Sequence, residues 1–182
     1  MAENFVHSFK WDPVKARGNV SKHGVDFSQA ATVFEDPLAL TTFDAAHSDS
    51  EARWFSLGSS RDGALLAISH TFEPTGATSA QIRIISARRA TRREREFYEN
   101  EPRCGEAMSQ TQDPQDDDMP AEIDFAGAMR GKFHRVGAVF DLPVYLEPEV
   151  QARLAALANA RGVELSSLVN EFLRKDLERL EA

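Results

Sequence analysis

The sequence predicts an α+β protein, in which a small antiparallel sheet with flanking helices is followed by a compact strand–helix–helix module. Three observations lead to this fold class. Helix-start signals stand near both ends of the first hundred residues, and short apolar runs lie between them. The acidic stretch 101–121 contains three prolines and almost no apolar residue, so we expect a flexible linker there.

Two helices open the first domain, which we place at residues 1–100. Asp12 is a suitable N-cap, Pro13 suits the first helical position, and Gly24 is a typical helix end. A second helix begins at Asp26, with Gln29 as its expected partner in a capping box, and it stops before the next proline.

A sheet follows, and a third helix closes the domain. Residues 61–63 (Arg-Asp-Gly) give a tight hairpin signal, whereas residues 72–81 are expected to form a long loop. The last helix starts at Thr91, where Glu94 completes a capping box. The expected strands are Leu38–Phe43, Ala52–Leu57, Ala64–Thr71 and Ile82–Ser86.

The last module, residues 137–182, shows a regular apolar pattern. Apolar and other residues alternate over 141–146, which predicts a short strand. A helix opens at Pro148 and ends at Arg161-Gly162, and a second helix carries an apolar stripe from Leu165 to Leu177. This is too little core for a monomer, so we expect pairing with a second copy.

The charge is unevenly distributed along the chain. The net charge is −8, but residues 101–121 alone carry one basic and six acidic side chains. A basic cluster runs from Arg83 to Arg95. The single Cys104 excludes an internal disulfide, and we expect neither a metal nor another cofactor. The N-terminus lacks a secretory pattern and no apolar run could span a bilayer, so we expect a cytoplasmic protein.

Several stretches of the first domain resemble the BrnT-type toxins, a branch of the RelE/ParE-like ribonuclease superfamily. The resemblance implies a RelE/ParE-like fold and an endoribonuclease that inhibits translation, with RNA as its substrate. Residues 72–81 are longer than this pattern leads us to expect. The matching stretches are FKWD at 9–12, KHGVDF at 22–27, AATVFEDPL at 30–38 and IRIISARR at 82–89, which runs into ATRRE at 90–94.

Residues 122–182 resemble the BrnA-type antitoxins, which implies a ribbon-helix-helix module that dimerises, binds an operator and represses its own promoter. Residues 122–136 would form the arm that binds the toxin half. In that family the partners are two chains; a natural fusion, an artificial joining or an overlapping gene pair would each give this sequence. The matching stretches are DF at 124–125, GAMRGK at 127–132, PVYL at 143–146 and GVELSSLVN at 162–170.

Metal-independent RNA cleavage needs a base, an acid and cations that hold the phosphate. Arg83 is expected on the open face of the last strand, and Arg88 follows at the corner before a capped helix N-terminus. Arg89 and Arg92 could bind phosphate as well, although Arg92 stands four residues before a glutamate, as in an ordinary surface ion pair. We therefore expect Arg83 and Arg88 to converge on one phosphate-sized hollow.

Five further residues are candidates for proton transfer or orientation. His70 titrates near neutrality, but it shares strand parity with apolar residues and could equally be a hydrogen-bonded core histidine. Lys22 and His23 end the first helix, where the helix dipole favours cations, and the resemblance to the BrnT-type toxins supports a functional role for them. Glu51 and Arg53 could orient one another as an acid/base pair or form a weak surface ion pair.

The second module offers candidates for DNA and for the toxin half. Outward positions of a ribbon fall to Asp141, Pro143 and Tyr145, and Pro143 cannot read a base. Ser166 and Ser167 lie near a helix start, where they could anchor phosphate. The apolar arm residues share helical spacing and are expected to pack on the toxin half; they are Phe125, Met129 and Phe133.

Two functions compete at this point. The first is a toxin–antitoxin pair in one chain, with the ribonuclease inhibited by its own C-terminal half. The second is a non-catalytic DNA-binding regulator that keeps the toxin fold as an interaction domain.

Overall fold

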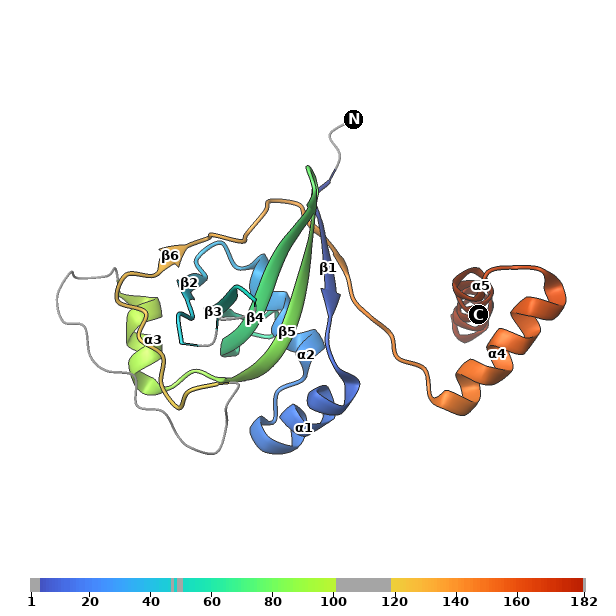
Figure 1. Ribbon diagram of the computed structural model, residues 1–182, viewed down its shortest axis with the longest axis horizontal. Coiled ribbons are helices and arrows are strands. Elements are labelled where there is room, and N and C mark those ends of the chain that lie inside the picture. The colour runs from blue at the N-terminus through green and yellow to red at the C-terminus, as the bar shows by residue number, and fades with distance from the viewer. Residues whose placement is uncertain (1–3, 47, 49–50, 101–118, 182) are drawn as a thin grey trace. The chain divides into compact units, whose positions relative to one another are not determined.

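A computed structural model describes residues 4–46, 48, 51–100 and 119–181 (Figure 1). By its internal contacts the chain divides into two compact units, Met1–Pro143 and Val144–Ala182. Most of the expected linker, residues 101–118, lies outside the described residues.

The first unit is built on one mixed sheet with helices on both sides. Its strands follow the order β6-β2-β3-β4-β5-β1-β7 across the sheet. The strands are β1 (Val6–Lys10), β2 (Leu40–Phe43), β3 (Arg53–Ser59), β4 (Leu65–Gly76), β5 (Ser79–Arg89), β6 (Met129–Arg130) and β7 (Val139–Asp141). The helices are α1 (Pro13–His23), α2 (Phe27–Ala31), the 3-10 helix η1 (Thr32–Glu35) and α3 (Arg92–Glu99).

The expected antiparallel sheet is confirmed for the centre only. Strands β2 to β5 pair antiparallel, but β1 pairs parallel with both β5 and β7. Strand β1, whose inward residues are His7 and Phe9, was not predicted from the sequence. A histidine in the inward row weakened the apolar alternation that identifies a strand.

The helix-start signals at Asp12 and Thr91 are confirmed. Asp12 accepts from the backbone N–H groups of Val14 and Lys15, and the capping box of Thr91 with Glu94 is present. The capping box expected at Asp26 is wrong, because the Gln29 amide donates to Asp62 instead. Asp26 still caps α2 through the Ser28 N–H.

The long loop expected at residues 72–81 is also wrong. Strands β4 and β5 continue through this stretch as a hairpin, with pairs as far out as Gly76 and Ser79. The shorter hairpin at residues 61–63 is confirmed, and Gly63 supplies the positive φ of 80° that its turn requires.

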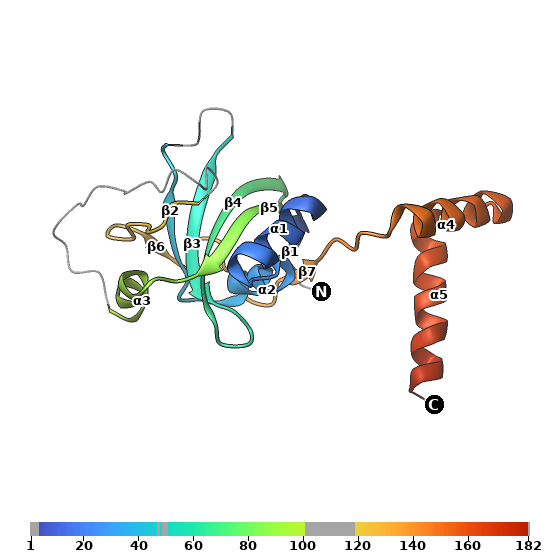
Figure 2. The same ribbon diagram turned by 90° about the horizontal axis from the view of Figure 1, so that it is seen from below.

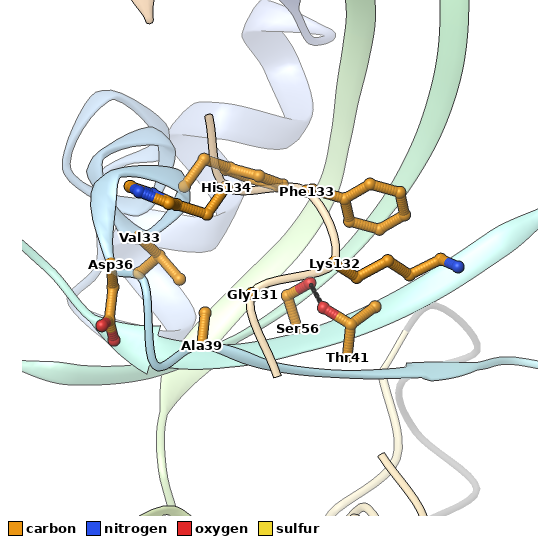
Figure 3. A pocket seen from close by; sticks show the side chains of 10 residues that line it. Val33, Asp36, Ala39, Thr41, Ser56, Gly131, Lys132, Phe133 and His134 are labelled. Carbon is orange, nitrogen blue, oxygen red and sulfur yellow. Dashed lines mark hydrogen bonds between the residues drawn. The ribbon is translucent and has the colours of Figure 1, made fainter. Parts of the chain in front are cut away.

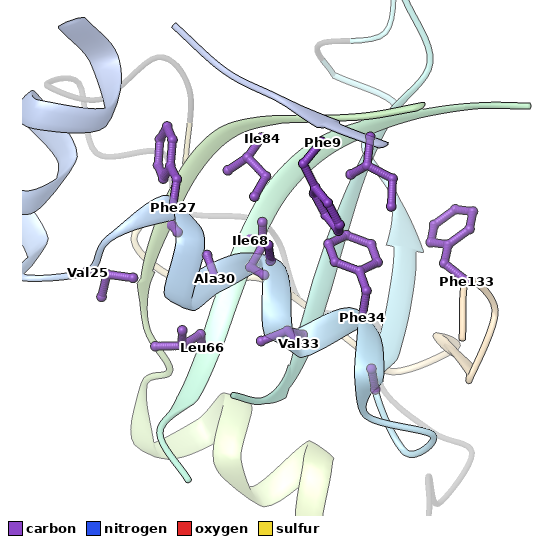
Figure 4. Packing of buried hydrophobic residues seen from close by; sticks show 14 residues of the cluster. Phe9, Val25, Phe27, Ala30, Val33, Phe34, Leu66, Ile68, Ile84 and Phe133 are labelled. Atoms are coloured by element: carbon purple, nitrogen blue, oxygen red, sulfur yellow. The ribbon is translucent and has the colours of Figure 1, made fainter. Parts of the chain in front are cut away.

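The two faces of the sheet carry separate cores. On the first face, α2 and η1 cover side chains such as Leu66, Ile68 and Ile84 (Figure 4). On the second face, Phe97 and Tyr98 of α3 pack with a cluster that includes Leu65 and Ala67 of β4. Alternate residues of β4 and β5 therefore face opposite layers.

Residues 119–141, which we call the strap, run around the first unit (Figure 2). Ile123 and Phe125 are buried in the second core, and Phe133 is buried in the first. Strand β6 pairs with β2 at one edge of the sheet, and β7 pairs with β1 at the other. The strap thereby covers both edges of the sheet that β2, β3, β4, β5 and β1 form.

The helical spacing expected for the arm within 122–136 is wrong, because this segment is extended and turned. Met129 is 48% exposed, whereas Phe125 and Phe133 are buried against different faces of the sheet. Gly131 has a φ of 61° and donates its N–H to Ala39 O, which seats the turn beside Thr41 and Ser56 (Figure 3). The close approach of Pro37 O leaves little space for a Cβ there.

The second unit consists of α4 (Pro148–Arg161) and α5 (Leu165–Leu180). The helix bounds agree with the sequence analysis, but residues 142–147 are not a strand; the strand ends at Asp141 and pairs with β1. Ala158 and Leu168 are the buried apolar residues of this unit. Its exposed apolar residues are Val144, Tyr145, Val150, Leu157, Val163, Leu173, Leu177 and Leu180.

Candidate functional site

The second face of the sheet has a polar end, which we call the open end. Arg53 of β3, Thr71 of β4 and Arg83 of β5 lie in one cross-strand row, which Lys10 of β1 extends. These residues alternate with the first-face residues of their strands, so their side chains belong to the face that packs Leu65 and Ala67. The register thus places three cations in one row.

Glu51 joins two of these cations. Its carboxylate accepts from Arg53 Nε at 3.3 Å and forms a second ion pair with Arg83 Nη2. The side chains of Glu51 and Arg83 are 32% and 37% exposed, so solvent and ligands can reach them. Glu51 and Arg53 are therefore in contact, as both interpretations of this pair require, and Arg83 shares the carboxylate.

A hollow of about 190 Å³ lies beside this row, between α1 and β5. Lys22 and His23 line it together with Ile85, which follows Arg83 by two residues in β5. Liquid water takes about 30 Å³ per molecule, so the hollow has room for several waters or a small polar group. Its remaining lining residues are Lys15, Gly18, Asn19 and Ser86.

Asn19 holds α1 in place and was missed by the sequence analysis. Its amide donates to Val25 O at 2.8 Å and Ala87 O at 2.7 Å, and its Oδ1 accepts from Ala87 N at 3.0 Å. These bonds fix the last turn of α1, with Lys22 and His23, against β5. The available signal was a polar residue in an otherwise amphipathic helix, which is weak.

Arg88 lies at the opposite, covered end of the same face. Its guanidinium forms a bidentate ion pair with Glu94, both bonds at 2.8 Å, and donates from Nε and Nη2 to Pro120 O of the strap. Glu94 is 0% exposed and also accepts from Thr91 N and Ile123 N. Arg88 is thus bound to protein groups on both sides of its guanidinium.

The expectation that Arg83 and Arg88 share one hollow is not met. Arg83 pairs across to Thr71 and Arg88 to Ala67, four residues apart on β4, which is roughly 13 Å at 3.3 Å per residue. Each binds a different carboxylate, and the hollow beside α1 is lined by neither. Both do lie on one face, because the bulge at Ile85 restores their common direction.

Further strap contacts surround the covered end. Arg130 donates to Leu38 O at 3.0 Å and to Tyr98 O at 2.9 Å, which ties the end of α3 to the segment just before β2. The Tyr98 hydroxyl donates to Asp36 Oδ2 at 2.7 Å. Burial and the neighbouring carboxylate raise the pKa of Tyr98 to about 12, so this hydroxyl stays protonated at neutral pH.

His70 lies on the first face, away from the arginines. It is 0% exposed, its Nε2 is 2.8 Å from Ser56 Oγ, and the ring packs against Phe34 and Phe133. Burial lowers its pKa to about 4. The geometry favours the core histidine among the two interpretations of His70, since the sheet separates it from Arg83.

The other predicted residues are dispersed. Arg89 is exposed, and the Arg92 side chain is 94% exposed and pairs with Glu96 at 3.3 Å. Asp141 is exposed and pairs with Ser8 through β7. In the second unit Tyr145, Ser166 and Ser167 are exposed, and Pro143 at its border is half-buried. Within the first unit, Arg89, Arg92 and Asp141 do not belong to the cross-strand row of the open end.

The described residues hold no group of three or more His, Cys, Asp or Glu side chains arranged to bind a metal ion. Within the described ranges, none of the helices combines the length and apolar character that a membrane crossing requires.

Comparison with known families identifies part of the chain. Residues 11–94 match the family described as ribonuclease toxin, BrnT, of type II toxin-antitoxin systems. The match identifies a BrnT toxin family domain over this segment, which is less than half of the 182-residue chain. The open end, the hollow and Arg88 all belong to it, apart from Lys10.

One solved structure that resembles the chain is the ribonuclease toxin BrnT of Brucella abortus. It is 21% identical, with a TM-score of 0.34, and the alignment covers 48% of this chain and 100% of that chain. No curated protein sequence matches the chain.

Proposed function

We propose that this chain is a type II toxin–antitoxin pair in one polypeptide. Its N-terminal half is a metal-independent endoribonuclease of RelE/ParE-like fold that inhibits translation, and its C-terminal half is a BrnA-type antitoxin. The observation that carries the proposal is the cation row of the open end, with Arg53 and Arg83 on one carboxylate, inside a segment that matches a ribonuclease toxin family.

The open end supports cleavage by positioned side chains. Arg53 and Arg83 hold the scissile phosphate and stabilise the charge that builds on it in the transition state. Glu51 between them takes the proton of the 2′-hydroxyl, and Lys22 or His23 in the adjacent hollow protonates the leaving oxygen. His70 has no part in this scheme because it is buried on the other face.

The strap supports inhibition by the C-terminal half. It covers Arg88 and both edges of the toxin-like sheet, and its aromatic residues Phe125 and Phe133 are inserted into the two cores. Because strap and toxin half are one chain, the inhibitor is present at an effective concentration near millimolar.

The second unit supports dimerisation and operator binding. Two helices with Leu157, Leu173 and Leu177 exposed leave an apolar surface that a second copy would bury. In the proposed ribbon-helix-helix dimer, Asp141, Pro143 and Tyr145 face DNA and Ser166 and Ser167 bind its phosphates, so the cytoplasmic chain represses its own promoter. Because the strand of this chain ends at Asp141, the ribbon over 142–146 would form on dimerisation.

Brief induction of strap variants in cells tests the nuclease. Ile123→Asn puts an amide into the second core and loosens the strap, and we expect cellular RNA to be degraded and growth to stop. Ala121→Asn, an exposed position in the same segment, is the control and should be harmless, like the parent chain. Adding Arg83→Ala to Ile123→Asn should restore intact RNA.

Intact RNA in the Ile123→Asn cells, with operator binding retained, would favour the non-catalytic regulator instead. RNA degradation that persists with Arg83→Ala would move the chemistry away from the open end.

A further inference from the structure

Every N–H group of the Arg88 guanidinium has an acceptor, and the acceptors fall on two sides. One side faces Glu94, with bonds from Nη1 and Nη2 at 2.8 Å each, and Nη1 also donates to Arg89 O. The other side, formed by Nε and Nη2, faces Pro120 O alone, at 3.2 and 2.9 Å. A single backbone carbonyl of the strap therefore occupies one edge of the fork.

That occupied edge suits an anion better than the group now bound to it. A guanidinium edge with two parallel N–H groups matches two oxygens of a phosphate, and the negative charge of a phosphate adds a Coulomb attraction that a neutral carbonyl lacks. Pro120 O supplies one neutral oxygen to both donors. Glu94, which also accepts from Thr91 N of its own capping box, holds the guanidinium in place when the strap is released, so little ordering is required when a ligand arrives.

The position of Arg88 on the sheet face allows it to contact the same RNA strand that the open end would bind. Arg88 and Arg83 lie on one face of β5, and their cross-strand partners are four residues apart on β4, roughly 13 Å. An extended single strand that places one phosphate at Arg83 would carry another phosphate past Arg88.

We propose that the Nε–Nη2 edge of Arg88 is a second subsite for a phosphodiester of single-stranded RNA, which the Pro120 carbonyl masks. The strap and the RNA backbone compete for the same two donors. The subsite rests on the proposed function for its ligand class, and it makes the strap an inhibitor that occupies one of the positions where the RNA backbone would bind.

The strap stays bound at Arg88 because its apolar side chains are buried in the second core. Met119, Ile123 and Phe125 are buried at 3%, 0% and 1% exposure beside the Arg88 corner. A change at Ile123 therefore releases Pro120 without altering any group of the toxin-like half. Asn is the suitable replacement, because it adds no charge that would itself attract or repel RNA.

The test measures binding of a non-cleavable probe to the full chain. The probe is a fluorescein-labelled 2′-O-methyl oligouridylate of ten nucleotides, followed by fluorescence anisotropy across a salt series. The chains are the parent, Ile123→Asn, the control Ala121→Asn, and the double variant Ile123→Asn with Arg88→Gln.

Ile123→Asn should bind the probe about tenfold tighter, which corresponds to roughly 1.4 kcal/mol. Its log–log salt slope should be steeper than that of the parent by about 0.7, the value for one added phosphate contact on a single strand. Ala121→Asn should match the parent, and the double variant should return to the affinity and slope of the parent. Equal slopes for Ile123→Asn and the double variant would overturn the subsite.

A second measurement covers the case in which Arg88→Gln unfolds the chain, as thermal melting would reveal. In Ile123→Asn the side-chain Nε–H resonance of Arg88 should shift on titration with the probe, and an unchanged resonance at saturation would overturn the subsite. Cleavage of ordinary RNA by Ile123→Asn distinguishes the subsite from the proposed nuclease. Cleavage with an unchanged Arg88 resonance would overturn the subsite alone. Binding that depends on Arg88, without cleavage, would support the subsite and overturn the nuclease.

Discussion

The two ends of the second sheet face carry similar residues in different environments. At the open end Arg83 and Arg53 share the half-exposed Glu51, whereas at the covered end Arg88 and Glu94 are buried together beneath the strap. An exposed ion pair contributes little to folding and can be rearranged by a ligand. A buried pair is costly to break. This difference is the reason why the proposed function gives the binding chemistry to Arg53 and Arg83, whereas Arg88 stabilises the fold while the strap is bound to it.

The largest expected effect is on stability, and it compares the two carboxylates. Glu94→Ala leaves the Arg88 guanidinium buried without its counter-ion and removes the capping box of α3. We expect a loss of about 3–5 kcal/mol in the free energy of unfolding, measured with urea. Glu51→Ala, at 32% side-chain exposure, should cost less than about 1 kcal/mol. Equal losses would break the comparison.

The second effect is a dependence of stability on pH that comes from the cores. His70 and His7 are both fully buried, and burial is the main cause that lowers the pKa of each to about 4. The unfolded chain has its histidines near pKa 6.5 and so binds more protons in this range. The contribution of these two histidines to the free energy of unfolding is therefore fully present above pH 6.5, and it is lost as the pH falls toward 4.

Each of these two histidines should contribute a loss of about 1 kcal/mol between pH 7 and pH 5.5. His7→Leu and His70→Gln should each remove part of that slope in urea unfolding at a series of pH values. A slope unchanged by both substitutions would contradict the burial of these rings.

The smallest effect is at Arg92, which distinguishes a surface cation from the open end. Its side chain is 94% exposed and forms an ion pair with Glu96, a neighbour on the same helix. Arg92→Ala should change the free energy of unfolding by no more than about 0.5 kcal/mol. A larger loss would show that α3 depends on this pair.

Local signals in the sequence were sufficient for the helices and the central strands. Asp12 with Pro13, Thr91 with Glu94, and Gly162 all act within one helical turn, so their partners could be named without the fold. Strand β1 and the path of the strap depend on pairing between distant segments. Nothing local marks Met129 as an edge strand that pairs with Thr41.

The sequence was sufficient to name several residues of the candidate site, but it did not show which of them lie together. Strand parity placed Arg83 on the open face, and spacing suggested the contact between Glu51 and Arg53. The sequence could not reveal that Glu51 also reaches Arg83, thirty-two residues away, since that contact requires the register of three strands. The burial of Arg88 likewise depends on Pro120 and Ile123, which lie across the linker from it.

The most direct test of the account is RNA cleavage by purified Ile123→Asn chain in the presence of EDTA, with Arg83→Ala and Arg92→Ala each added in turn. We expect the strap-loosened chain to cleave RNA, Arg83→Ala to reduce the rate by about a hundredfold or more, and Arg92→Ala to leave it within about twofold. Equal rates for the Arg83 and Arg92 variants, or a requirement for added metal, would contradict a nuclease built on the open end.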